Sequence, residues 1–202
     1  PHPNLIPTFK NLDIFNDREF TPPPTFKDDY KGRKALQIQQ ISMKDNLDIR
    51  YDTKIPCDSC PVNKINDWAP AEYQREIERL TPAERKVWDA AFKKEFATFK
   101  LLKTEADRIR FQYQRYMEDY LRCVNSLDDN VGRLLQYLKD RNLEKNTIVV
   151  YMSDQGFFLG EHGLYDKRFM YEEAFRTPMM IRFPVAFSGN KSTDAFVLNL
   201  DV

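Results

Sequence analysis

Polar and charged residues that could bind a metal ion and an anion cluster between residues 153 and 168, in the segment SDQGFFLGEHGLYDKR. Asp154 offers an anionic oxygen and Gln155 a neutral carbonyl oxygen, which are the ligands that calcium and magnesium prefer over transition metals. Gly156 would let the chain turn close to a bound group. One Asp-Gln pair supplies only half of a metal site, so we expect further ligands from elsewhere.

Three more residues of this segment could act on an anionic substrate. His162, one of two histidines in the chain, lies between Glu161 and Gly163. Lys167 could face an oxyanion as a point charge, and Arg168 could do so as a planar fork of donors. Each residue also has an ordinary alternative as a structural or solvated side chain. Taken singly, they do not define a function.

The segment follows an expected strand. Residues 147–152, TIVVYM, have strong β-propensity and apolar side chains on both faces, as in a buried strand of a parallel sheet. A helical pattern and a short turn precede them, and this order is typical of an α/β fold. In open α/β sheets, ligands bind beyond the carboxyl ends of the strands, so Asp154 is well placed for a binding site.

A helix is predicted to begin at Thr81. This residue can cap it, Pro82 suits the first helical position, and Glu84 completes the spacing of a capping box. Apolar residues recur on one face, which we expect to lie in the core. These residues are Val87, Ala91, Phe92, Phe96 and Phe99.

A second helix is predicted from about Glu105 to Asp140. At roughly 1.5 Å per residue it would exceed about 50 Å, which suits a helix lying along a larger sheet. Its apolar face is assigned to packing. The face comprises Ile109, Tyr113, Tyr116, Met117, Tyr120, Leu121, Val124, Leu127, Val131, Leu134, Leu135 and Leu138.

The remaining segments are less regular. Residues 1–30 are rich in proline and predict an extended arm laid over another part of the protein. A helix is expected around Ala35 to Met43. Cys57 and Cys60 form one Cys-x-x-Cys without the second pair of a zinc site, so a local disulfide or two free thiols is favoured over redox or metal chemistry.

Composition excludes several classes of protein. Basic and acidic residues balance at 31 each, so no overall charge draws the chain to nucleic acid or to an anionic membrane. No apolar run approaches the roughly 20 residues of a membrane-spanning helix, and the first residues lack the pattern of a signal peptide. We expect a soluble chain.

Taken in order, these motifs resemble the sulfatases of the alkaline phosphatase superfamily, particularly bacterial formylglycine-dependent enzymes that act on sulfated sugars. The resemblance covers the strand, the Ser-Asp-Gln-Gly turn, the Gly-Glu-His-Gly segment, the Asp-Lys pair and the Arg-Thr-Pro lead into a strand at Met179 to Phe183. The preceding helix, the Asn-Leu-Asp at residues 199–201 and the initial Pro-His are also similar to the family. Residues 31–100 resemble it only loosely.

The resemblance implies a role for each matching residue. Asp154 and Gln155 match one pair of calcium ligands, and the remaining ligands lie outside this chain. Lys167 matches a lysine that contacts the sulfate and steadies charge as the ester bond breaks. His2 matches a histidine that contacts the ester and protonates the leaving sugar oxygen. His162 lies where related enzymes carry a histidine near the substrate.

Other residues match the family less directly or not at all. Arg168 is expected to contact substrate beside the lysine, and Arg176 to fix the start of the next strand. The family attacks with a formylglycine made in a Cys/Ser-x-Pro/Ala-Ser-Arg segment, and this chain has none. The first pair of metal-binding aspartates is also missing. We therefore expect residues 1–202 to be part of a larger catalytic domain and to be inactive alone.

The predicted fold class is α/β, part of an alkaline-phosphatase-like three-layer sandwich with a largely parallel sheet and long flanking helices. Residues 1–70 would form the arm and loops, 71–140 the helices, and 141–202 the strand-loop-strand region of the metal and sulfate site. Surface left uncovered by the missing parts would favour self-association.

The predicted function of the intact protein is hydrolysis of sulfate esters on an amino sugar or glycosaminoglycan unit, with calcium, in the periplasm or after secretion. One alternative keeps the fold but makes the protein a phosphodiesterase or phosphonate hydrolase. Another is a non-catalytic module that binds a sulfated glycan or a partner protein.

Overall fold

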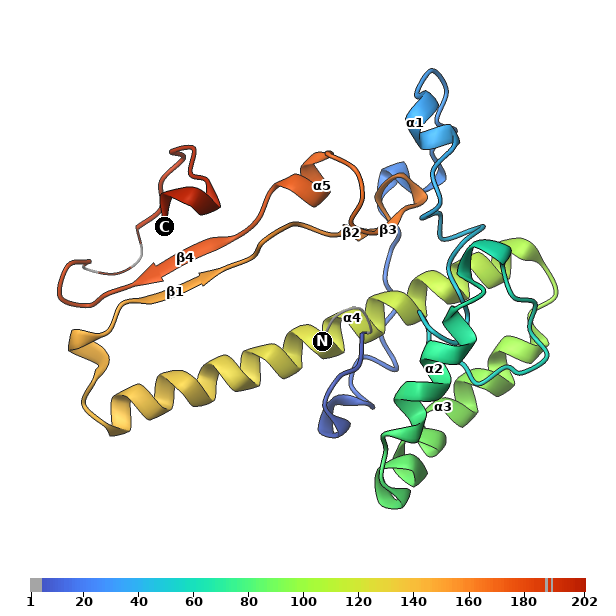
Figure 1. Ribbon diagram of the computed structural model, residues 1–202, viewed down its shortest axis with the longest axis horizontal. Helices are drawn as coiled ribbons and strands as arrows, with labels where there is room; N and C mark the ends of the chain where they lie inside the picture. The colour runs from blue at the N-terminus through green and yellow to red at the C-terminus, as the bar shows by residue number, and fades with distance from the viewer. Residues whose placement is uncertain (1–4, 188, 190) are drawn as a thin grey trace. The chain divides into compact units, whose positions relative to one another are not determined.

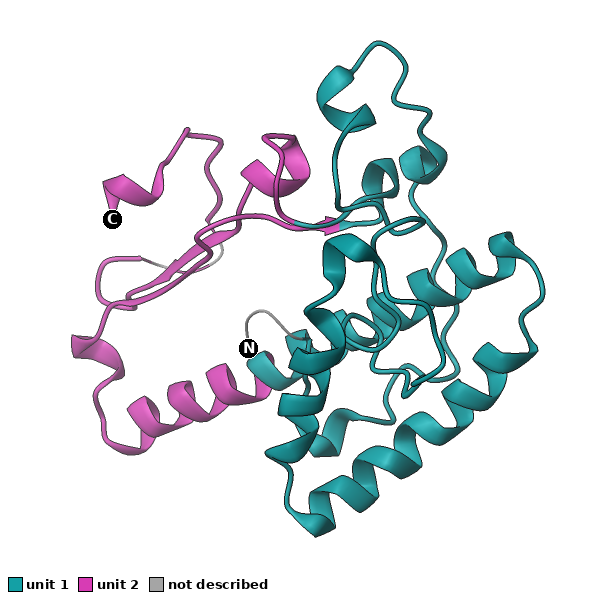
Figure 2. Ribbon diagram, turned by 45° about the vertical axis from the view of Figure 1, so that its right-hand side comes forward, with its two compact units in different colours: residues 1–127, 159–166 teal, residues 128–158, 167–202 magenta. Residues whose placement is uncertain are grey.

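The computed structural model describes residues 5–187, 189 and 191–202, so His2 lies outside the described residues. The chain forms two compact units (Figure 2). Unit 1 contains residues 1–127 and 159–166, and unit 2 contains residues 128–158 and 167–202.

Along the described chain the α-helices precede the strands, except for one short α-helix before the last strand (Figure 1). The helices are α1 Lys34–Gln37, α2 Ala69–Glu78, α3 Pro82–Leu101, α4 Glu105–Asp140 and α5 Glu172–Phe175. The strands are β1 Val149–Met152, β2 Phe158–Leu159, β3 Tyr165–Asp166 and β4 Met179–Arg182. None of the described helices is both long enough and apolar enough to cross a membrane.

The start of α3 follows from its capping box, as predicted. The Thr81 hydroxyl accepts from the Glu84 amide at 3.3 Å, and the Glu84 carboxylate accepts from the Thr81 amide at 2.8 Å. The predicted apolar face is wrong at Val87, which is 49% exposed. Trp88 takes that place instead, because it packs with Phe92 against residues of α2 and the arm.

The predicted bounds of α4 are confirmed, but its apolar face is only partly buried. Tyr113 and Tyr116 are buried, whereas Val124, Leu127 and Leu134 are exposed. The predicted continuous apolar packing face was therefore wrong in unit 1, where charged side chains take part of the buried surface of α4. There, the buried part of α4 is largely ionic, and its charged members are Arg115, Glu118, Asp119 and Arg122.

These four charged residues neutralise one another within α4. Asp119 accepts from Arg115 and from Arg122, each at 2.8 Å, and it is completely buried. The Arg122 Nε also donates to the carbonyl of Ile14 at 3.0 Å. Such pairing is required because removing an unpaired charge from water carries a large free-energy penalty.

The predicted arm does lie over another part of unit 1. Gln114 of α4 accepts from the Phe20 amide at 2.8 Å and donates to its carbonyl at 2.6 Å, as a strand neighbour would. Further along, the Phe26 ring packs edge-on against Tyr113, with 5.1 Å between ring centroids. These contacts with α4 hold residues 20–26 of the arm in place.

The helix expected around Ala35 to Met43 is shorter and ends at Gln37. The following residues pair with the β3 region instead. The Tyr165 amide donates to the Ile41 carbonyl at 3.1 Å, and the Met43 amide donates to the Gly163 carbonyl at 2.9 Å. This tertiary pairing overrides the local helical pattern.

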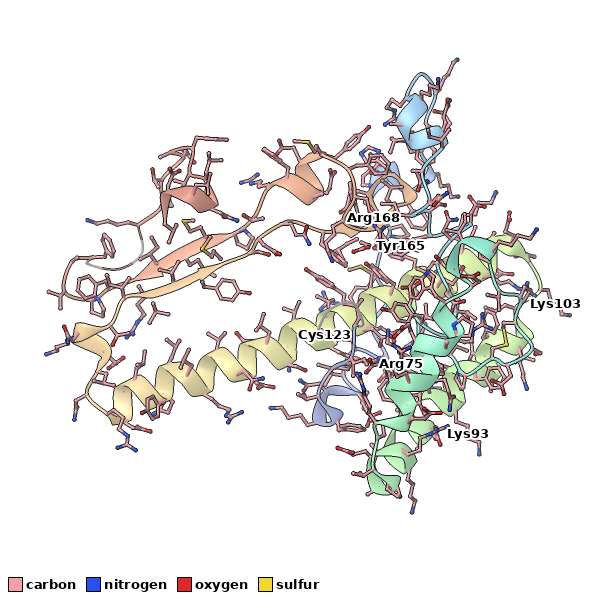
Figure 3. All side chains as sticks on the ribbon, in the orientation of Figure 1. Arg75, Lys93, Lys103, Cys123, Tyr165 and Arg168 are labelled. Carbon is pink, nitrogen blue, oxygen red and sulfur yellow. A yellow bond between two sulfur atoms is a disulfide. The ribbon has the colours of Figure 1, made fainter. Side chains whose placement is uncertain are left out.

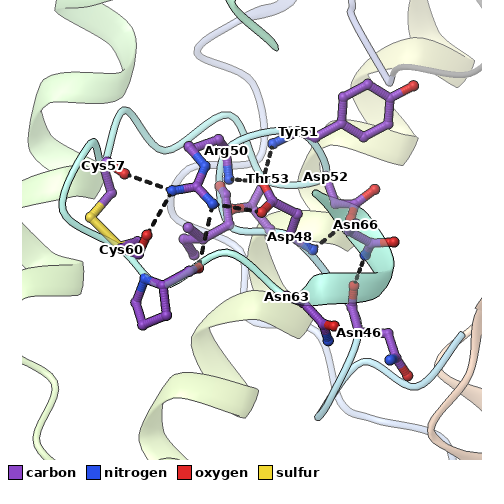
Figure 4. A network of polar contacts seen from close by, with 12 residues as sticks. Asn46, Asp48, Arg50, Tyr51, Asp52, Thr53, Cys57, Cys60, Asn63 and Asn66 are labelled. Atoms are coloured by element: carbon purple, nitrogen blue, oxygen red, sulfur yellow. Dashed lines mark hydrogen bonds and ion pairs between the residues drawn. A yellow bond between two sulfur atoms is a disulfide. The ribbon is translucent and has the colours of Figure 1, made fainter. Parts of the chain in front are cut away.

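Cys57 and Cys60 form a disulfide, one of the two predicted states. Buried Arg50 stabilises this loop (Figure 4), because its Nη1 donates to the carbonyls of Cys57 and Cys60, each at 3.0 Å. The Arg50 Nη2 pairs with buried Asp48 at 2.8 Å.

The region after α4 contains two short sheets. β1 pairs with β4 in antiparallel register, from Val149 opposite Arg182 to Met152 opposite Met179, and β2 pairs with β3. The strand predicted over residues 147–152 exists, but it is not a buried parallel strand among the described residues. Among the described residues, β1 pairs with β4 alone, and Val150 in β1 is 38% exposed.

Candidate functional site

The Asp154-Gln155 turn follows β1 directly. The Ser153 hydroxyl donates to the Gln155 carbonyl at 2.8 Å and lies 3.5 Å from the Asp154 carboxylate. The Asn199 side chain donates to the Ser153 carbonyl at 3.0 Å, so the backbone is held from both sides. Asp154 is exposed and Gln155 is half-buried. The turn therefore presents a carboxylate on a fixed backbone.

Gly156 is required by close backbone packing in unit 2. Its amide donates to the Ala174 carbonyl at 2.9 Å, and the Phe157 amide donates to the Glu173 carbonyl at 2.7 Å. A Cβ atom on Gly156 would lie 2.1 Å from the Glu173 oxygen. Gly156 therefore makes room for residues 173–176. Its predicted close approach to a bound group stays a prediction.

Lys167 lies beside the segment that follows the turn. Its Nζ is 5.6 Å from the centroid of the Phe157 ring, two residues after Gln155, within the range of a cation–π contact. Lys167 is half-buried, whereas Arg168, labelled in Figure 3, is exposed. Unit 2 thus brings a cation close to the chain that carries the metal-binding candidates.

Arg176 lies between α5 and β4. Its amide donates to the Glu172 carbonyl at 2.8 Å and closes α5, and its side chain is exposed. Its carbonyl would lie 3.0 Å from a Cβ atom on Gly156. Arg176 therefore lies just before β4, and its expected role in fixing the start of that strand stays a prediction.

His162 belongs to unit 1, in the turn Glu161–Gly163, where it has a left-handed φ of 54°. Its Nδ1 lies 2.6 Å from Oδ2 of Asp28. Its amide donates to the Thr25 hydroxyl at 3.2 Å, and its carbonyl accepts from the Tyr30 hydroxyl at 2.6 Å. Three arm residues therefore fix both the backbone and the imidazole of His162.

Asp28 is ionised at this position. Burial alone would raise the pKa of its carboxyl, but hydrogen bonds from the Tyr30 amide, His162 and Arg33, with the Arg33 charge, lower the pKa from 3.8 to about 2. Asp28 is not among the residues predicted from the sequence. No local pattern marks it, because it lies 134 residues before its histidine partner.

The structure groups the candidate residues in two sets. Asp154, Gln155, Lys167 and Arg168 belong to unit 2, and His162 belongs to unit 1. Within the described part of the chain, no three His, Cys, Asp or Glu side chains come together to hold a metal ion. The two oxygen donors of the turn fit a hard cation that takes its other ligands elsewhere.

The described helices and short strands form an α/β chain. In it, two side chains with oxygen donors follow β1 directly, and a lysine lies beside the next segment. The chain belongs to the sulfatase family, whose model matches residues 62–202.

Several relatives share this assignment. The chain is 40% identical over 205 residues to an N-acetylglucosamine-6-O-sulfatase of Bacteroides thetaiotaomicron, covering 100% of this chain and 36% of the relative. It is 27% identical over 153 residues to the iduronate 2-sulfatase of Mus musculus, covering 75% of this chain and 24% of that protein.

A solved structure supports the fold. It shows a protein in complex with its substrate D-glucosamine-2-N,6-O-disulfate, and it matches with 41% identity and a TM-score of 0.79. The match covers 91% of this chain and 37% of that one. The predicted α/β fold class, part of an alkaline-phosphatase-like domain, is therefore confirmed. The chain spans about a third of the length of the N-acetylglucosamine-6-O-sulfatase and of the protein in this solved structure.

Proposed function

We propose that the full-length protein hydrolyses sulfate esters of sugars, with an amino sugar or glycosaminoglycan unit as substrate. The observation that carries this proposal is the Asp154-Gln155 turn with Lys167 beside it, in a chain of the sulfatase family. The substrate class is supported by the similarity to an N-acetylglucosamine-6-O-sulfatase and to a protein bound to a disulfated glucosamine.

Asp154 and Gln155 would hold a calcium ion with ligands from the rest of the protein. Bound there, calcium would supply positive charge beside the sulfate oxygens. The fixed backbone of the turn, tied by Ser153 and Asn199, would limit the reorganisation needed when the ion binds. This arrangement suits a site built to stabilise charge.

Lys167 would lie beside the sulfate and neutralise the charge that develops on the bridging oxygen as the ester bond breaks. Its contact with the Phe157 ring restrains its position. Arg168 would contact the substrate from the exposed surface. His2 would protonate the leaving sugar oxygen, as a group that titrates near neutrality can. The nucleophile would be a formylglycine from the rest of the full-length protein.

The protein would act in the periplasm or after secretion. The Cys57–Cys60 disulfide supports this location, because disulfides persist in oxidising compartments and are rare in reducing ones. Buried Arg50 donates to both cysteine carbonyls, so the loop is organised around the disulfide.

The test is hydrolysis by the full-length protein, co-expressed with an enzyme that makes formylglycine. N-acetylglucosamine 6-sulfate, an iduronate 2-sulfate and the phosphodiester bis-p-nitrophenyl phosphate would be supplied separately, with and without a calcium chelator. We expect sulfate release from the amino sugar and its loss with chelator. Hydrolysis of the phosphodiester alone would replace this proposal with phosphoryl transfer. Glycan binding without turnover, unaffected by chelator, would favour a binding module.

A further inference from the structure

We propose that Cys57 and Cys60 form a thiol–disulfide exchange site, a redox function separate from the hydrolysis proposed above. A dithiol reduces the Cys57–Cys60 disulfide, with Cys60 as the attacked sulfur and Cys57 as the leaving thiolate. The Cys-x-x-Cys spacing alone does not indicate redox chemistry, but the contacts of Arg50 and Ser59 do. All four residues lie in unit 1.

The backbone of both cysteines is held by contacts that do not depend on the bond between their sulfur atoms. Nη1 of Arg50 donates to the carbonyls of Cys57 and Cys60, each at 3.0 Å (Figure 4). Nη2 lies 3.4 Å from the Pro61 carbonyl. One guanidinium therefore binds three backbone carbonyls of this loop. These hydrogen bonds can persist after reduction, so the two thiols stay close enough to form the disulfide again.

Arg50 is itself fixed before any exchange takes place. Its Nη2 donates to Oδ2 of Asp48 at 2.8 Å, and the two side chains are only 5% and 3% exposed. Oδ1 of Asp48 accepts from the amides of Arg50 and Tyr51, each at 2.9 Å. Asp48 is thus bound to the backbone on one side and to the guanidinium on the other. The planar fork of Arg50 is held in the orientation that binds both cysteine carbonyls.

The two sulfur atoms have different surroundings, which assigns their roles. Cys57 is buried in an apolar cluster with Ile49 and Ile55, whereas Cys60 is half-buried, so a dissolved thiol has better access to Cys60. Ser59 Oγ lies 3.8 Å from Sγ of Cys57, and it must be the donor because a disulfide sulfur carries no hydrogen. The same hydroxyl would donate to a thiolate on Cys57, and a stabilised thiolate leaves faster.

The exchange takes place in two steps. A thiolate of the dithiol attacks Sγ of Cys60, the Cys57–Cys60 bond breaks, and Cys57 leaves as a thiolate that takes up a proton. The second thiolate of the dithiol then attacks the dithiol sulfur of this mixed disulfide and releases Cys60, which is also protonated. The dithiol loses two electrons and two protons and becomes a disulfide, and the two cysteines gain them.

Loss of the bond should leave unit 1 folded. The disulfide encloses only Asp58 and Ser59, which are both exposed. Cross-linking a short loop stabilises a protein less than cross-linking a long one. The apolar cluster around Cys57 also has packing partners that the bond does not hold, namely Phe96, Phe99 and Phe111. The dithiol form is therefore expected to be a folded state.

The first measurement is reduction of the full-length protein by dithiothreitol without denaturant. Alkylation with iodoacetamide and mass spectrometry of the peptide that contains Cys57 and Cys60 would give the extent of reduction. We expect complete reduction with an unchanged circular dichroism spectrum, and complete reoxidation by oxidised glutathione. Reduction only at denaturant concentrations that unfold the protein would overturn the inference and leave a purely structural disulfide.

Two further measurements test the roles of the sulfur atoms. After brief exposure to glutathione and acid quenching, fragmentation of the peptide should place the mixed disulfide on Cys60; its presence on Cys57 would contradict the assigned roles. Ser59→Ala should slow reduction by dithiothreitol about threefold, because the leaving thiolate loses a donor. The matched control is Ser59→Thr, which keeps the hydroxyl and should keep the rate. An unchanged rate in Ser59→Ala would also contradict these roles.

The role of Arg50 is tested by Arg50→Lys, which keeps the positive charge but not the planar fork. We expect the equilibrium constant for disulfide formation by glutathione to fall about tenfold, as for the loss of one hydrogen bond to a charged group. The matched control is Arg75→Lys, because exposed Arg75 pairs with Glu72 on the surface of α2. Equal constants in Arg50→Lys and the unaltered protein would refute the role of Arg50. The other measurements do not depend on whether Arg50→Lys folds.

Discussion

Substitution of Gly156 by alanine should disturb the turn that carries Asp154 and Gln155. The new Cβ would lie 2.1 Å from the Glu173 carbonyl oxygen, whereas real Cβ atoms essentially never approach another atom closer than 3.0 Å. The two segments must therefore separate by at least 0.9 Å, the difference between these distances. Overpacking of this kind costs about 1–3 kcal/mol.

A displacement of this size beside a catalytic residue can reduce activity by about 100-fold. We expect Gly156→Ala to lower kcat/KM for sulfate release by about that factor and to lower the denaturation midpoint of the full-length protein. The assays are sulfate release under saturating and subsaturating substrate and chemical denaturation.

The matched control is Gly132→Ala in α4. Apart from the adjacent backbone of α4, no described atom lies within 4 Å of the place that a Cβ atom would take at Gly132, so alanine fits there without strain. It should stabilise the protein by about 0.5–1 kcal/mol through its helix propensity and leave activity unchanged. If Gly156→Ala matched the unaltered protein in both assays, the packing of the turn against residues 173–176 would be refuted.

Three further predictions concern stability, and each is checked by denaturation. Burial raises the pKa of the Asp52 carboxyl from 3.8 to about 7. The free energy of unfolding should therefore be highest below about pH 4 and fall as the pH rises to about 7. The substitution Asp52→Asn should remove that fall. Replacing Cys57 and Cys60 by serine should cost about 2 kcal/mol, because the disulfide closes a short loop, and equal stability of the two proteins under oxidising conditions would contradict this. Phe92→Ala should cost about 3–5 kcal/mol and exposed Val87→Ala much less, whereas equal losses would contradict the assigned core.

The sequence predicts the helices of this chain well because their signals are local. The capping residues of α3 lie within four positions of one another, and the bounds of α4 follow from a long apolar repeat. The buried face is less predictable, because it depends on the partners. Trp88 is buried in place of Val87 since α2 and the arm pack on that side.

The buried charges of α4 illustrate a second limit. Arg115 and Asp119 read as solvent-facing residues by type, yet both are buried and paired. The pairing is local, at a spacing of four residues, but burial depends on the arm and on other segments of unit 1. A pattern of apolar residues alone cannot show where a helix buries ions.

Some residues of the candidate site can be predicted from local sequence motifs, and others cannot. Asp154, Gln155 and Lys167 are identified by their order after a strand and by the family resemblance. Asp28 is absent from any local motif, and only the folded arm brings it to His162. The antiparallel partner of β1 was missed for a similar reason, because strand pairing between residues about 30 positions apart is a tertiary property.

Sulfate release from N-acetylglucosamine 6-sulfate by full-length Asp154→Asn and Lys167→Met variants tests whether residues 153–168 form the sulfate-hydrolysing site. Exposed Lys145→Met serves as the matched control for the loss of a lysine. We expect each site variant to lose at least about 100-fold in kcat/KM, excess calcium to restore part of the activity of Asp154→Asn, and Lys145→Met to be unaffected. Activity of both site variants within about twofold of the unaltered protein would show that residues 153–168 do not form the sulfate-hydrolysing site.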